Sequence, residues 1–181
     1  MKEISLNILD IAENSVKAKA SLTEILISEE GDMLTLTIKD DGCGMDEQTV
    51  KSVIDPFYTT RKTRSVGLGI PLLKLACEQT GGSLSIESSI NESDHGTTVR
   101  AIFFKNHIDF IPLGDVTSSI VTLIQGHPDT DFLFRHTFGE TVVELDTRQL
   151  REVLGDVSLA EYEVLQWITG YLTDQYNGQI T

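Results

Sequence analysis

The sequence is poor in cysteine, proline and tryptophan, and these shortages exclude several classes of protein. Only two of its 181 residues are cysteine and four are proline, so the chain is neither a disulfide scaffold nor a proline-rich disordered polymer. Cys43 and Cys77 have no partner at metal-binding spacing, and we expect free thiols in a reducing compartment. The histidines form no ligand pair on one helix face.

A long hydrophobic run is also absent. No stretch approaches the roughly 20 apolar residues that a membrane-spanning helix requires. The first residues, MKEISLNILDIAENS, mix apolar with acidic and polar side chains where a signal peptide would need an apolar stretch. We therefore expect a cytoplasmic protein with no membrane partner.

Positive charge is scarce and unevenly spread. The chain has 14 Lys and Arg against 28 Asp and Glu, a net charge of -14, which argues against nucleic acid as a partner. Residues 106–181 contain no lysine. This contrast predicts two domains, a larger one over residues 1–105 and a small acidic α+β module over residues 106–181.

Hydrophobic periodicity predicts the elements of residues 1–105. They are a helix over 3–19, strands over 23–30 and 32–40, a helix over 46–54, a helix over 70–82, and strands over 82–89 and 96–104. This order predicts an α/β fold, a two-layer sandwich of a mixed sheet with helices on one face.

Residues 106–115 read as a linker to the C-terminal module. A helix over 115–126, a hairpin over 131–146 and helices over 147–156 and 158–176 follow. Ser158 and Glu161 have the spacing of a capping box. We expect Trp167 and Tyr171 to lie in the core rather than at an interface.

Polar residues on the first helix form one candidate site. Asp10, Asn14 and Lys17 share a helix face. Alone, they are typical of a solvated surface. However, an asparagine amide oxygen suits Mg²⁺, which prefers oxygen ligands, and a lysine one turn along could reach a phosphate.

The stretch KDDGCGMD, residues 39–46, has two readings. Asp-Gly pairs are common in hairpin turns. Alternatively, a carboxylate could accept from a ligand donor while the glycines let the ligand approach the backbone. Farther along, Gly67 and Gly69 precede a helix whose N-terminus favours anions, and a strand begins with Thr97 and Thr98.

Taken in order, these stretches resemble the motifs of the GHKL ATPase family, which includes gyrase-type topoisomerases, Hsp90, histidine kinases and MutL. DIAENSVKA resembles the N-box, DDGCGM the first glycine box, GLGIPLLK the second and HGTTV the final Gly-Thr box. DPFYTTR is similar to the lid segment of one histidine-kinase subgroup. The resemblance covers residues 1–105, and four motifs in this order make it specific.

The resemblance implies a Bergerat-type fold that binds ATP with Mg²⁺. It implies that Asn14 is the Mg²⁺ ligand, that Asp40 accepts from the adenine amine, and that Gly42 and Gly44 make room for the ring. The other nucleotide-binding residues that it implies are Lys17, Met45, Phe57, Arg61, Arg64, Gly67, Leu68, Gly69, Ile70, Thr97 and Thr98.

Two departures from the family pattern bear on activity. Asp10 stands where hydrolytic members have a glutamate base; it could act as catalytic base through a water or only orient the Mg²⁺ shell. No phosphoacceptor histidine segment precedes the ATP-binding motifs, so we expect a stand-alone form without that domain.

Two function classes follow. One is a kinase or ATPase acting on a separate protein partner in bacterial signalling or regulation. The other is a non-catalytic, ATP-dependent binding module. In both, ATP or ADP binds the first domain and a protein partner docks through residues 106–181. A homodimer is left open.

Overall fold

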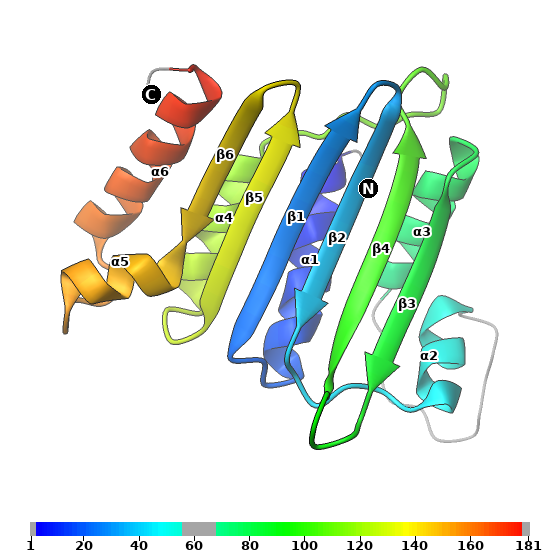
Figure 1. Cartoon of the computed structure of the whole chain (residues 1–181), viewed down its shortest axis with the longest axis horizontal. Helices are drawn as coiled ribbons and strands as arrows, with labels where there is room; N and C mark the ends of the chain where they lie inside the picture. Colours follow the sequence, from blue (N-terminus) through cyan, green and yellow to red (C-terminus); the bar gives the residue numbers. More distant parts are fainter. Residues whose placement is uncertain (1–2, 56–67, 179–181) are drawn as a thin grey trace.

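The computed structural model describes residues 3–55 and 68–178, which build one six-stranded sheet (Figure 1). The strands are β1 (Leu22–Glu30), β2 (Met33–Asp40), β3 (Ser83–Ser89), β4 (Gly96–Phe104), β5 (Asp131–Phe138) and β6 (Thr141–Asp146). Their order across the sheet is β3-β4-β2-β1-β5-β6. Because β1 pairs parallel with β5 while the other neighbours are antiparallel, the sheet is mixed, as predicted.

The helices are α1 (Ile4–Lys17), α2 (Glu47–Ile54), α3 (Gly69–Gln79), α4 (Val116–Gly126), α5 (Thr147–Leu154) and α6 (Tyr162–Tyr176). Figure 1 shows α1, α3 and α4 behind one face of the sheet and α6 beside the β6 edge. In the described part of the chain, no helix lies over the opposite face. The predicted α/β arrangement with helices on one face is confirmed.

Alternation along the strands decides which side chains meet the helices. Ile25 and Ile38 are opposite each other on β1 and β2 and are at most 1% exposed. The adjacent pair, Glu24 and Lys39, faces away from the helices and forms an ion pair over 3.7 Å. Each buried isoleucine contributes about 1.5–3 kcal/mol to folding, so the apolar set fixes the register of the sheet.

The C-terminal segment continues the sheet of the N-terminal segment. β5 pairs with β1 from Leu22 opposite Asp131 to Glu29 opposite Phe138, and both segments contribute to one buried cluster. Residues 1–105 and 106–181 therefore share a sheet and a core. That they are two domains, each folding by itself, stays a prediction.

The segment predicted as a linker, residues 106–115, accepts hydrogen bonds from the first residues of α1. The N–H of Ile4 donates to the carbonyl of Pro112 at 2.9 Å, and the N–H of Ser5 donates to that of Leu113 at 2.8 Å. The first four N–H groups of a helix have no partner within the helix, so this segment satisfies two of them. Gly114 follows at φ +77°, and a Cβ there would lie 2.3 Å from the Glu3 carboxylate.

A side chain of α6 covers the outer edge of β6. The N–H of Glu144 donates to Gln175 Oε1 at 2.9 Å, and Gln175 Nε2 donates to the carbonyl of Glu144 at 3.0 Å. The amide thus takes the place of a neighbouring strand at one residue. Such cover blocks edge-to-edge pairing with another chain.

Two predictions for the last helix are wrong. α6 begins at Tyr162, and the Ser158 hydroxyl accepts from the N–H of Ala160 instead of closing a capping box. Trp167 is 52% exposed because α6 buries another face, made of Val164, Leu165, Ile168 and Leu172. Tyr171 is partly buried and packs against the core.

Over residues 3–55 and 68–178, none of the helices has the length and apolar character needed to cross a bilayer.

Candidate functional site

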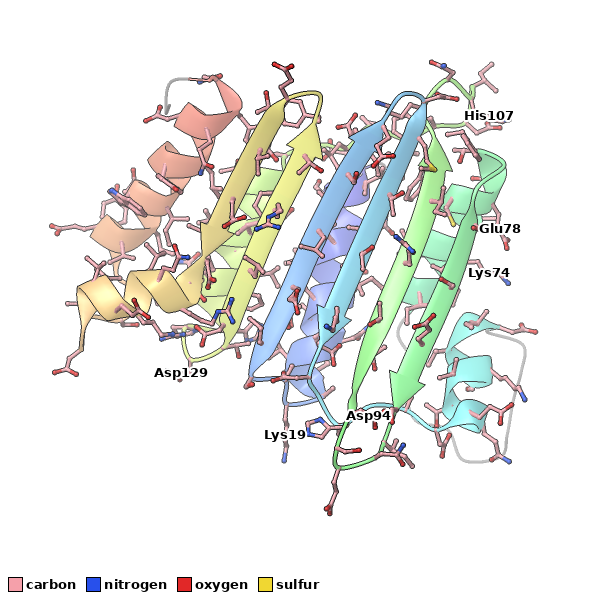
Figure 2. The ribbon with its side chains drawn as sticks, viewed as in Figure 1. Lys19, Lys74, Glu78, Asp94, His107 and Asp129 are labelled. Carbon is pink, nitrogen blue, oxygen red and sulfur yellow. The ribbon has the colours of Figure 1, made fainter. Side chains whose placement is uncertain are left out.

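The predicted site residues gather at the lower end of the sheet in Figure 1, where β2 ends, β4 begins and α1 runs into β1. Asp40 is the last residue of β2, and Thr97 lies opposite it on β4. Lys19, just after α1, and Asp94, just before β4, mark this end in Figure 2, while His107 lies at the other end. The fold therefore brings the first helix, the first glycine stretch and the final Gly-Thr stretch together.

Asp40 is held from two sides. The Ser15 hydroxyl donates to Oδ2 at 2.7 Å, and the N–H of Gly42 donates to Oδ1 at 2.9 Å. These contacts fix the carboxylate between α1 and β2. Each carboxylate oxygen has two lone pairs, so Asp40 keeps the capacity to accept from a ligand.

The neighbouring Asp41 has a different role. It accepts from the N–H groups of Ser21 at 2.8 Å and Leu22 at 2.9 Å and from the Ser21 hydroxyl. Partial burial raises the pKa of Asp41, but these donors outweigh it, so the pKa lies below its usual value. Asp41 thus closes the turn into β1, whereas Asp40 keeps acceptor capacity for a ligand.

The glycines of this stretch are required by contacts within the chain. A Cβ at Gly42 would lie 2.8 Å from the Cβ of Ala18, and one at Gly44, where φ is +70°, would lie 1.8 Å from the carbonyl oxygen of Ser89. The N–H of Cys43 also donates to the carbonyl of Ala18 at 3.0 Å. The stretch is therefore clamped between α1 and β3, and space for an adenine ring beside it stays a prediction.

Ser88, which the sequence did not single out, connects the two glycine-containing stretches. Its hydroxyl accepts from the N–H of Met45 at 2.8 Å, donates to the carbonyl of Gly96 at 2.9 Å, and lies 2.8 Å from Thr97 Oγ1. Ser88 is opposite Thr97 across β3 and β4. Strand alternation could have indicated this role only with the register known.

His95 was also missed. Its Nδ1 lies 2.8 Å from the carbonyl oxygen of Gly42, so the β3–β4 loop touches the first glycine stretch. Its position directly before Gly96 and Thr97 was the feature of the sequence that could have indicated a place at the site.

Gly69 of the second glycine stretch, GLGIPLLK, lies against α1 near Asp10. A Cβ at Gly69 would lie 3.2 Å from the Cβ of Asp10 and 3.5 Å from its Oδ2. Asp10, Asn14 and Lys17 are exposed along the same face of α1, and α3 begins at Gly69, so its N-terminal dipole lies beside this face. One helix thus contacts both glycine stretches, at Asp10 and at Ser15.

Other predicted residues lie elsewhere. Thr98 pairs with Lys39 and Glu87 on the opposite face of the sheet from Thr97, so the structure does not bring its side chain to Asp40. Ile70 is 7% exposed and part of the core, and Leu68 is 64% exposed. The predicted contacts Phe57, Arg61, Arg64 and Gly67 lie outside the described residues.

The oxygen atoms that α1 presents suit a magnesium ion. Asn14 offers an amide oxygen and Asp10 a carboxylate one turn away, and both are exposed. Mg²⁺ prefers oxygen donors, keeps several waters, and binds through one or two protein oxygens together with phosphates. Within residues 3–55 and 68–178, no group of three His, Cys, Asp or Glu side chains could hold a metal by itself.

Solved structures support the whole architecture. The chain is similar to the structure described as "Aquifex aeolicus MutL ATPase domain complexed with ADP", with a TM-score of 0.52 and 14% identity, covering 96% of this chain and 70% of that one. At this identity the likeness shows the fold alone. It extends past residue 107, so the continuation of the sheet through β5 and β6 is part of the shared fold.

Sequence comparisons identify the family. The chain is 30% identical over 104 residues to sporulation kinase C of Bacillus subtilis, covering 56% of this chain and 23% of the kinase. It is 32% identical over 109 residues to sensor histidine kinase YxdK of the same organism, covering 56% of this chain and 33% of YxdK. The chain therefore spans a third or less of these relatives. Residues 2–107 match the family described as "Histidine kinase-, DNA gyrase B-, and HSP90-like ATPase". The chain belongs to this ATPase family, which the four sequence stretches had indicated.

Proposed function

We propose that this chain binds Mg·ATP or Mg·ADP and acts as a kinase or ATPase on a separate protein partner in bacterial signalling or regulation. The observation that carries the proposal is the fixed carboxylate of Asp40, held by Ser15 and Gly42 at the end of the sheet where the family motifs meet. The named kinases among its relatives support the signalling role.

Adenine presents an amine donor beside a ring acceptor. Asp40 has lone pairs left for the amine. Thr97, directly opposite on β4, can hold a water for the ring nitrogen through its hydroxyl, which Ser88 positions at 2.8 Å. A guanine carbonyl would instead face the Asp40 carboxylate, leaving both acceptors unpaired.

The phosphates then extend along α1 towards Gly69. The N-terminus of α3 and the Lys17 ammonium favour anions there, and Asn14 with Asp10 would hold Mg²⁺. When bound, this ion supplies positive charge that offsets the phosphates and the acidic chain. The predicted contributions of Arg61 and Arg64 remain expectations.

The role of Asp10 distinguishes a catalytic protein from one that only binds ATP. As a base, its carboxylate would take a proton from the attacking group. Among the described residues, however, no hydrogen bond orients this side chain, which favours the second candidate function, an ATP-dependent binding module without turnover. Activity that appears only with the partner would agree with the first.

Calorimetric titration of the full chain with ATP tests the proposal. We expect binding in the presence of Mg²⁺, weaker binding without it, and little binding of GTP. The matched control is Asp41→Asn, which alters the adjacent carboxylate that the chain uses for itself and should leave ATP affinity unchanged. Absence of ATP binding with Mg²⁺ would reject the proposal.

A further inference from the structure

The outer face of α6 carries an aromatic pair between carboxylates. Trp167 and Tyr171 stack with ring centroids 4.8 Å apart and planes 13° apart, although Trp167 is 52% exposed. Glu163 precedes Trp167 by one turn and Asp174 follows Tyr171 by nearly one, so the four side chains lie along one face. We call Glu163, Trp167, Tyr171 and Asp174 the acidic aromatic face.

This face is separate from the proposed nucleotide site. α6 lies beside β6 at one edge of the sheet, and no described element lies outside it (Figure 1). The opposite side of the helix packs into the core. Tyr171 is partly buried against the core, whereas the Trp167 ring lies on the outside of the helix.

The charge around the face is negative and uncompensated. Residues 152–178 contain five carboxylates and no lysine or arginine; the carboxylates are Glu152, Asp156, Glu161, Glu163 and Asp174. Within the described residues, no hydrogen bond or ion pair involves the side chain of Glu163 or Asp174.

The three arginines of residues 106–181 are engaged elsewhere. Arg135 pairs with Glu144, Arg148 pairs with Asp146 at 2.7 Å, and Arg151 pairs with Asp131 at 2.8 Å. None is left to neutralise the face.

Exposed apolar side chains precede the face in the chain, at the start of α6 and just before it. Tyr162 is 73% exposed, and Val153 and Val157 in the preceding segment are 85% and 50% exposed. Tryptophan and tyrosine in such surroundings are typical anchors of protein interfaces. The surface thus combines apolar area with one sign of charge.

We propose that the acidic aromatic face docks an arginine-containing segment of a partner protein. A guanidinium group stacks on aromatic rings and pairs with carboxylates in a planar fork, and the order carboxylate, two rings, carboxylate matches both needs. Nucleic acids and anionic membranes present phosphates, which this charge repels. This inference rests on the proposed function only in assuming that the chain has a separate protein partner.

The test uses the full chain without nucleotide and its single tryptophan, so emission reports on this face alone. The probes are three synthetic peptides of equal length containing Leu and Ser with Arg, Lys or Glu at the same positions. We expect the Arg peptide to bind and change Trp167 emission, the Lys peptide to bind more weakly, and the Glu peptide not to bind. Equal binding of the Arg and Glu peptides would overturn the proposal.

Matched variants separate docking from general attraction to an acidic protein. E163Q with D174N should weaken the Arg peptide roughly tenfold at low salt, or about 1.4 kcal/mol of binding free energy, because both carboxylate contacts are lost. E87Q with E92Q removes the same charge at the far side of the sheet and should change affinity less than twofold. Equal weakening by the two double variants would reject a specific site.

Trp167→Ala should also weaken binding, measured by calorimetry, with circular dichroism as the check on folding. Titrating the unchanged chain with Mg·ATP as well as with the Arg peptide distinguishes the two proposals. Peptide binding without ATP binding rejects only the proposed function, and ATP binding without peptide binding rejects only the docking face. Asp40→Asn should leave the peptide affinity unchanged.

Discussion

The Ser15 hydroxyl donates a hydrogen bond to the carboxylate of Asp40 across 2.7 Å and so joins the last turn of α1 to the end of β2. Ser15 is 3% exposed. The same helix contacts the second glycine stretch through Asp10, so the geometry of both ends of the site depends on how α1 sits on the sheet.

Asp40→Asn and Ser15→Ala should weaken ATP binding to different degrees. Asp40→Asn replaces an acceptor with a donor towards the adenine amine, and we expect a loss of about 1–3 kcal/mol in binding free energy. Ser15→Ala removes one of the two groups that position the carboxylate and keeps the carboxylate itself, so it should lose about 1 kcal/mol. Calorimetry measures both. Ser118→Ala removes another serine–aspartate hydrogen bond, on α4, and should not alter affinity; equal ATP and GTP binding by the unchanged chain would remove the role of Asp40.

Asp10→Asn and Asn14→Ala should separate turnover from binding. If Asp10 is the base, Asp10→Asn abolishes phosphate release while ATP affinity stays within about twofold, because a base acts in the transition state. Asn14→Ala should instead lose the Mg²⁺ dependence of binding. A phosphate-release assay beside calorimetry checks both. Unchanged turnover in Asp10→Asn would end the general-base role of Asp10, and absence of turnover in the unchanged chain would support the binding-module reading. Equal weakening of binding by both variants would place Asp10 in the Mg²⁺ shell.

The two cysteines should react very differently with a thiol reagent. Cys43 is exposed in the first glycine stretch, whereas burial raises the pKa of Cys77 to about 11. Because the thiolate is the reactive form, mass spectrometry near neutral pH should find Cys43 labelled and Cys77 not. Mg·ATP should slow labelling of Cys43. Labelling of Cys77 at the same rate in the folded chain would contradict its burial.

Asp41 should make stability depend on acidity. Its pKa in the folded chain lies below the usual value of 3.8, so its contribution is present above that value and is lost as pH falls through the lower, folded pKa. Asp41→Asn should therefore be less stable near neutral pH, by about 1 kcal/mol for an exposed charged hydrogen-bond acceptor. Urea unfolding at several pH values measures the difference. A difference that does not shrink below about pH 4 would exclude the carboxylate as its cause.

Gln175→Ala should destabilise the outer edge of the sheet. It removes both hydrogen bonds to the backbone of Glu144, and the expected loss is about 1–2 kcal/mol. Gln175→Glu keeps an acceptor but loses the donor, so its stability should lie between those of the unchanged chain and Gln175→Ala. Thermal unfolding measures stability, and light scattering detects association through the uncovered edge. Unchanged stability and association in Gln175→Ala would show that the cover is unimportant.

The sequence predicted the elements and the motif residues because both depend on local pattern. Alternation in residues 23–40 indicated two half-buried strands, and the order of the polar stretches indicated the family. Ser15 and Ser88 could not be found this way. Their roles come from partners 25 and 43 residues away, which only the register of the sheet brings close.

The C-terminal segment shows the same limit. Alternation predicted the hairpin of β5 and β6, but a hairpin can stand alone or extend an existing sheet, and nothing local distinguishes these outcomes. Trp167 was placed in the core because tryptophan side chains are on average largely buried. Which face of α6 is buried depends on the edge of β6, and that edge buries Ile168 and leaves Trp167 outside.

The parallel pairing of β1 with β5 also has a consequence for folding during synthesis. Residues 22–29 must wait for residues 131–138 before that side of β1 is paired. Until then a growing chain exposes a strand edge in the middle of its eventual sheet, and pairs made over such long sequence separations form slowly. We expect the nascent chain to be most prone to aggregate after β4 has left the ribosome and before β5 has. A chain ending at Lys105 would remain in that condition permanently.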